Sequence, residues 1–158
     1  MTETEKTLVK DSWSLIAGEK DLGDVGLIMF NKLFQDNSSL RSLYSFLRDD
    51  NVNDDVNGKL RSHGKGVMEV VDIAVSSIDD LRGLHPIVVD LGCRHYKYGV
   101  QKSHLQPVGK SLIYSLETSI GAGFNKDMRR SWLKFFAVLS ISFSEGLDKG
   151  QHLVENDG

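Results

Sequence analysis

Two histidines, His63 and His95, each lie on the apolar stripe of a predicted helix, at positions where leucine or valine is expected. The first stripe has helical spacings of three and four and comprises Val56, Leu60, His63, Val67, Val70, Val71 and Ala74. The second comprises Leu84, Val88, Leu91, His95 and Tyr98. One such histidine is more often a hydrogen-bonded core residue than a ligand. Two on consecutive helices instead favour a shared internal ligand, most simply a metal ion.

The two stripes supply too few donors to hold a metal ion by themselves. Zinc normally takes four ligands, and neither stripe carries a third histidine, a cysteine or a carboxylate. An iron–sulfur cluster is excluded because Cys93 is the only thiol in the chain. Haem resolves the shortage, since its porphyrin provides four nitrogens and leaves one or two axial positions for the protein. The valines beside the histidines also suit its large apolar face.

Length and composition predict one soluble domain over residues 1–158. The chain has 158 residues, of which 40% are hydrophobic and 26% charged, values ordinary for a globular protein. We expect a core over residues 3–147 and a frayed tail over 148–158. The net charge of −3 argues against a nucleic-acid partner, because phosphate binding needs a clustered basic surface.

Cysteine usage and the first residues predict a cytoplasmic protein. A lone Cys93 forms no intramolecular disulfide, which fits a reducing compartment. The opening Met-Thr-Glu-Thr-Glu lacks both the apolar core of a signal peptide and a myristoylation glycine. The longest apolar stretches are also too short to span a bilayer. We therefore expect no membrane partner.

The periodic segments along the chain are helical, and strand-type alternation is nearly absent. Thr2 and Glu5 have the spacing of a capping box that opens the first helix, which should end near Gly18. The polar residues 48–55 indicate a surface loop. Later helix starts are indicated by Ser77 or Asp79, Pro107 and Asn125. The sequence thus predicts an all-α protein of about seven to eight helices.

These residues, taken in order, resemble the globin family from about Thr4 to Leu147. The resemblance rests on a set of motifs at matching spacings: His63-Gly64, Val67, the step of 32 residues to His95, Leu91 one turn earlier, Trp13, and the segment from Leu33-Phe34 to Tyr44. Gly26 and Gly64 match the small residues at which two globin helices cross closely. The resemblance implies a globin fold, a three-over-three helical sandwich around haem b.

The resemblance also implies roles for individual residues. His95 would be the proximal ligand of the iron, and His63 the distal histidine on the opposite face. The other residues expected at the haem are Val67 and Phe30 in the distal pocket, Leu91 and Val100 on the proximal side, and Leu105 at the start of the following helix. Each of these apolar residues would also belong to the core.

One position departs from the family pattern. Globins almost always have phenylalanine where the alignment places Tyr44, and this ring wedges the haem. Either Tyr44 takes that role and brings a hydroxyl that needs a hydrogen-bond partner when buried, or the register shifts and Phe46 takes it. The ungapped count from Phe34 favours Tyr44.

Among globins, the chain is most similar to the neuroglobin-like group. The similar segments are Val70–Ala74, Asp79–Leu81, Leu91–His95 and Val108–Leu112. This similarity implies that His63 also binds the iron until oxygen or another diatomic gas displaces it. Reversible oxygen binding, for storage or transport, is the expected function. The alternatives are nitric-oxide dioxygenase or nitrite-reductase activity with a reductase partner, or a haem-based sensor or partner-binding module. A monomer or a homodimer is expected.

Overall fold

The computed structural model describes residues 1–44 and 56–157, and every regular element in these residues is helical. The elements are α1 (Glu3–Ala17), α2 (Leu22–Asp36), η1 (Ser38–Leu43), α4 (Val56–Ser76), α5 (Leu81–Tyr96), η2 (Lys102–His104), α6 (Leu105–Ile120), η3 (Gly121–Gly123) and α7 (Lys126–Asn156). The all-α prediction is therefore confirmed. The loop expected at 48–55 and the alternative wedge residue Phe46 lie outside the described residues. None of the described helices combines the length and apolar character needed to cross a membrane.

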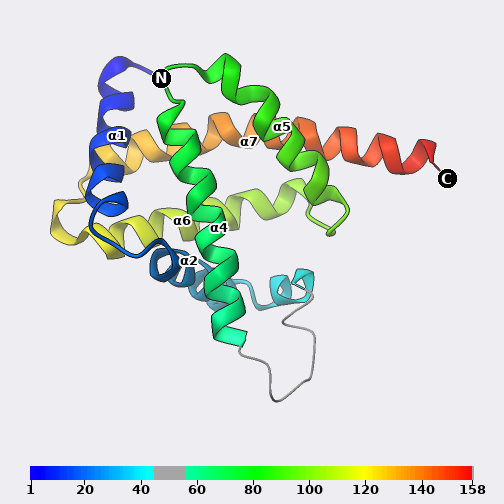
Figure 1. The fold of residues 1–158 in the computed structure, drawn as a ribbon, viewed down its shortest axis with the longest axis horizontal. Coiled ribbons are helices and arrows are strands. Elements are labelled where there is room, and N and C mark those ends of the chain that lie inside the picture. The colour runs from blue at the N-terminus through cyan, green and yellow to red at the C-terminus, as the bar shows by residue number, and fades with distance from the viewer. Residues whose placement is uncertain (45–55, 158) are drawn as a thin grey trace.

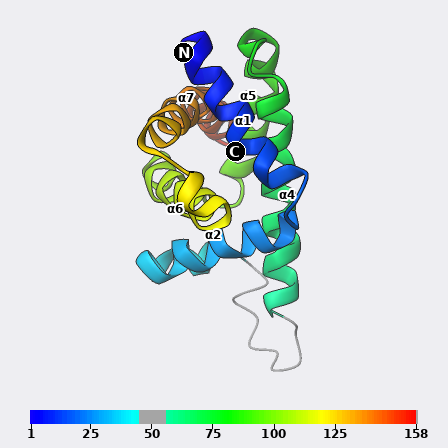
Figure 2. The same ribbon diagram turned by 90° about the vertical axis from the view of Figure 1, so that its left-hand side faces the viewer.

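The helices pack as the expected three-over-three sandwich. Figure 2 shows α1, α4 and α5 on one side of the molecule and α6 and α7 on the other, with α2 beneath α6. The largest contacts join α5 to α7 and α2 to α4, and Figure 2 shows α4 running across α2. The fully buried side chains between the layers include Met29, Leu33, Leu60, Met68, Leu116, Trp132 and Phe135. Helices α4 and α5, which carry the two histidines, are thus each fixed to a helix of the opposite layer.

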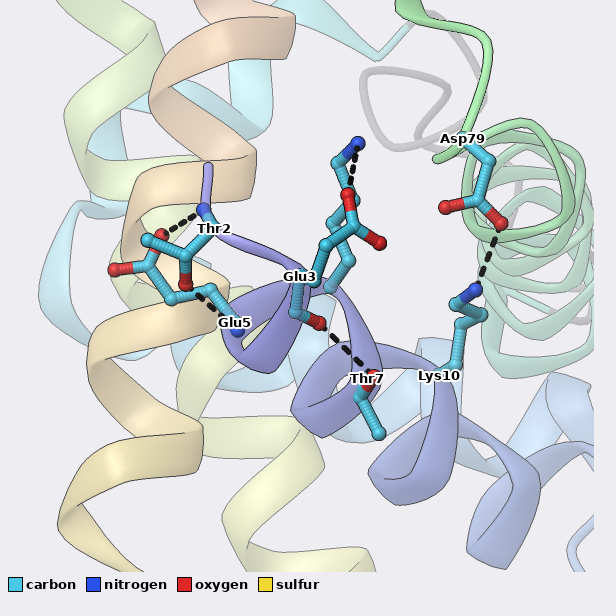
Figure 3. Close-up of polar contacts among 7 residues, drawn as sticks. Thr2, Glu3, Glu5, Thr7, Lys10 and Asp79 are labelled. Atoms are coloured by element: carbon cyan, nitrogen blue, oxygen red, sulfur yellow. Dashed lines mark hydrogen bonds and ion pairs between the residues drawn. The ribbon is translucent and has the colours of Figure 1, made fainter.

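Local capping sets most helix starts. The Thr2 hydroxyl accepts from the N–H of Glu5 at 3.1 Å, and the Glu5 carboxylate accepts from the N–H of Thr2 at 2.8 Å, as Figure 3 shows. Helix α5 is capped by Asp80, whose carboxylate accepts from the N–H of Gly83 at 3.0 Å. The sequence had suggested Ser77 or Asp79 for this cap. Asp79 instead accepts from Lys10 of α1 at 2.7 Å, which ties α1 to the start of α5 (Figure 3).

Helix α7 continues past Asp148, where a frayed tail was expected, and ends at Asn156. Gly146 and Gly150 allow its backbone to touch α5. A Cβ at position 146 would overlap the carbonyl oxygen of Val89, and one at position 150 would lie 2.7 Å from the carbonyl oxygen of Cys93. This contact extends the docked part of α7 as far as Gly150, and the exposed residues beyond it project from the body of the molecule (Figure 1).

The crossing of α4 over α2 predicts a large difference between two glycines of α4. A Cβ at position 64 would lie 2.7 Å from the carbonyl carbon of Gly26, whereas a Cβ at position 66 meets nothing within 4 Å. Gly64→Ala should therefore cost about 1–3 kcal/mol of unfolding free energy by forcing the helices apart. Gly66→Ala, the matched control, should stabilise the protein by roughly 0.5–1 kcal/mol, because alanine is the better helix former. Urea unfolding measures both changes, and equal effects would contradict the close crossing.

Candidate functional site

Helices α4 and α5 carry His63 and His95, and both side chains are partly buried. Burial lowers the pKa of His63, and the charge of His95 acts in the same direction. A lowered pKa favours the neutral imidazole, which is the form that binds a metal. Both residues that the stripes had singled out are thus partly buried imidazoles.

A backbone hydrogen bond fixes the ring of His95. Its Nδ1 lies 2.7 Å from the carbonyl oxygen of Leu91, one turn earlier on α5. A carbonyl can only accept, so we assign the proton to Nδ1, which leaves the lone pair of Nε2 available to a ligand. Phe143 of α7 and Tyr98 flank the ring, with centroids 5.3 and 5.8 Å away. The hydrogen bond and the aromatic contacts together orient this imidazole.

Aromatic rings from α2 and from the end of η1 pack against the ring of His63. The centroid of the His63 ring lies 5.0 Å from that of Phe30 and 5.2 Å from that of Tyr44. Phe30 is buried in the core on α2, and Tyr44 follows the last turn of η1. Phe34 extends the cluster, with its centroid 5.3 Å from that of Tyr44. Tyr44 is therefore part of an aromatic cluster around His63, and its role as the haem wedge stays a prediction.

The remaining predicted site residues in the described part of the chain lie on α4, on or just after α5, and at the start of α6. Val67 lies one turn after His63 on α4, and Leu91 lies one turn before His95 on α5. Val100 follows α5, and its N–H donates to the carbonyl of His95 at 3.4 Å. Leu105 is the first residue of α6. All four are partly buried rather than enclosed in the core, although their side chains are apolar.

Phe143 is a residue of the candidate site that the two histidine stripes did not indicate. It contacts the ring of His95, yet it lies 48 residues further along the chain. The only signal for a site role is the fold itself, which packs α7 against α5.

The donor set and its surroundings fit a haem. Within residues 1–44 and 56–157, no group of three or more histidine, cysteine, aspartate or glutamate side chains is placed to hold a metal ion. A metal ion between the two imidazoles would thus need other ligands, which a porphyrin contains. The hydrogen bond of His95 uses Nδ1 and leaves the lone pair of Nε2 to a ligand, and Val67, Leu91, Val100 and Leu105 are partly buried and apolar. These are the properties that a flat apolar macrocycle with one or two axial positions requires.

The hydroxyl of Tyr44 predicts a loss of stability in alkali. Burial raises its pKa to about 12, whereas an unfolded tyrosine titrates near 10. The folded protein then holds the proton that the unfolded chain loses, so stability is unaffected below pH 10 and falls as the pH rises towards 12. Between pH 10 and 12, the unfolding free energy of Tyr44→Phe should fall by about 2 kcal/mol less than that of the wild-type protein, as denaturant titrations measure. Tyr114→Phe, at a residue 42% exposed, is the control, and equal effects would contradict the burial of the Tyr44 hydroxyl.

Comparison with known proteins identifies the relatives of the chain. The Globin family model matches residues 28–142. Neuroglobin-1 of Oncorhynchus mykiss is 33% identical over 155 residues, which cover 96% of each chain. Neuroglobin of Danio rerio is 31% identical over 157 residues, again 96% of each chain. The fold is similar to that of the hexacoordinated heme protein from an anhydrobiotic tardigrade, with a TM-score of 0.81, 20% identity, and coverage of 94% of this chain and 96% of the other.

Proposed function

Since this chain belongs to the globin family, we propose that it holds one haem b between His95 and His63 and binds oxygen and other diatomic gases reversibly. The observation that carries the proposal is a pair of partly buried imidazoles: His95 uses Nδ1 to bind the carbonyl of Leu91 and keeps Nε2 for a ligand, and His63 packs against the rings of Phe30 and Tyr44. Bound haem supplies an iron with two axial positions and a gas-binding capacity that no side chain has. The partly buried apolar residues Val67, Leu91, Val100 and Leu105 would contact its faces.

His95 would be the permanent axial ligand. Its Nδ1–H donates to the carbonyl of Leu91, which holds the ring in one tautomer and makes Nε2 a better donor. Phe143 and Tyr98 prevent the ring from turning away. These contacts come from α5 itself, the residues just after it and α7, so the orientation of the ring is set by the protein.

His63 would be the second axial ligand when no gas is present. Its lowered pKa keeps the imidazole neutral near pH 7, and a neutral imidazole can compete for the iron. The rings of Phe30 and Tyr44 restrict where His63 can go once it is displaced. The apparent gas affinity then equals the intrinsic affinity multiplied by the fraction of molecules in which His63 is released.

Carbon monoxide binding to the reduced protein tests this function. If His63 must leave first, the observed rate should rise with carbon monoxide concentration and reach a plateau at the rate of His63 release. A rate that rises linearly at all concentrations would contradict ligation by His63. Absence of any spectral change on adding carbon monoxide or oxygen would contradict gas binding altogether.

We further propose a cytoplasmic protein that works as a monomer or a homodimer. The lone Cys93, which forms no disulfide within the chain, supports a reducing compartment. Cell fractionation tests the compartment, and light scattering of the purified protein tests the oligomeric state. Recovery mainly in a membrane fraction, or a mass above that of a dimer, would overturn these proposals.

A further inference from the structure

An ion-pair cluster joins α4 to α2 close to His63. The Nε of Arg61 lies 3.0 Å from a carboxylate oxygen of Asp24, and its Nη2 binds a carboxylate oxygen of Asp21. Arg61 is two residues before His63, and Gly64, at the close crossing with Gly26, directly follows it. The backbone of His63 is therefore tied to α2 on both sides. We call Arg61, Asp21 and Asp24 the Arg61 clasp.

The clasp is built into the start of α2. The carboxylate of Asp21 caps the helix by accepting from the N–H groups of Gly23 and Asp24 at 2.8 and 3.2 Å. The N–H of Asp24 and the guanidinium of Arg61 hold the pKa of Asp21 below its usual range, so this carboxylate stays charged. A Cβ at position 23 would lie 2.7 Å from Cζ of Arg61, so Gly23 provides the space in which the guanidinium lies. Arg61 thus occupies a defined position although its side chain is 40% exposed.

We propose that Arg61 is a positioning residue that keeps His63 within reach of the iron, an inference that rests on the function proposed above. An internal ligand on a fixed backbone has a high effective concentration at its target, and freedom of that backbone lowers the concentration. The clasp fixes α4 on the N-terminal side of His63, and the Gly26–Gly64 crossing fixes it on the other side. A looser clasp would therefore slow the return of His63 to the iron and favour an external gas.

The test compares variants by flash photolysis of the carbon monoxide complex. Arg61→Met keeps the aliphatic stem and removes both ion pairs, and Asp24→Asn weakens one pair without touching the Asp21 cap. Each variant should slow His63 rebinding about two- to fivefold and raise the apparent carbon monoxide affinity by a similar factor, the range expected for exposed ion pairs. The difference in rebinding rate between each variant and the wild-type protein should shrink in 1 M salt, because salt screens exposed charges.

A matched control separates positioning from general stability. Arg129 of α7 pairs with Glu117 of α6 at 2.7 Å and is 42% exposed, but it lies on neither histidine helix. Arg129→Met should leave His63 rebinding unchanged even if it lowers the unfolding free energy as much as Arg61→Met does. Unchanged rebinding in Arg61→Met, or an equal change in Arg129→Met, would overturn the positioning role alone. A five-coordinate wild-type protein would overturn the proposed ligation by His63 and, with it, the positioning role of Arg61.

Discussion

The reduced His63→Leu variant under argon is expected to show five-coordinate haem, while the wild-type protein shows six-coordinate haem. Leucine fills much of the same space and packs against Phe30 and Tyr44, but it offers no lone pair to the iron. Carbon monoxide binding should lose its plateau, because no internal ligand has to leave. The apparent affinity should rise by the reciprocal of the released fraction, about tenfold or more if that fraction is a tenth or less. Visible absorption spectra and rapid-mixing kinetics measure these changes.

The control for this variant is His152→Leu, which removes an exposed histidine at the far end of α7. It should keep both the six-coordinate spectrum and the plateau. If His63→Leu also keeps the wild-type spectrum, His63 is not an iron ligand. Competition between its imidazole and the gas then does not control the apparent gas affinity.

His95→Ala is expected to lose most of its haem during purification. His95 is the histidine whose Nδ1–H is bound to a carbonyl and whose Nε2 is presented to the site, so its removal deletes the permanent ligand. Because even partners of metal ligands contribute 10–100-fold to affinity, loss of the ligand itself should weaken retention on the order of 100-fold or more. Haem content per chain and the rate of haem transfer to an acceptor protein measure the loss.

Free imidazole tests whether the loss comes from the missing ligand rather than from misfolding. Imidazole should enter the space left in His95→Ala and restore part of the haem content and spectrum. Normal haem stoichiometry in His95→Ala without added imidazole would refute the proximal role. His152→Ala serves as the matched control and should retain a full complement of haem.

Helices and caps were predictable where the controlling interactions are local. The capping box of Thr2 and Glu5 and the cap at Asn125 depend on residues three positions apart, and both appear in the structure. The start of α5 was misplaced because Asp79 is bound by Lys10, which is 69 residues away. The length of α7 was underestimated because Gly146 and Gly150 matter only once α5 lies against them.

In the candidate site, too, the features set by local sequence were predictable and those set by contacts between distant residues were not. Helical periodicity placed His63 and His95 on inward stripes, because that pattern belongs to each helix separately. It gave no sign of Phe143 at the ring of His95, since α7 meets α5 only in the folded chain. Arg61 also carried no signal, because Asp21 and Asp24 lie 40 and 37 residues before it. Contacts distant in sequence thus complete a site whose main donors were visible from the start.

Electron paramagnetic resonance of the oxidised wild-type protein at low temperature tests the central claim most directly, because the signal reports the axial ligands of the iron. Axial ligation by His63 and His95 predicts one low-spin ferric haem per chain with the signature of two imidazoles. A predominantly high-spin signal at neutral pH, or protein that takes up no haem when haem is supplied in excess, would contradict it.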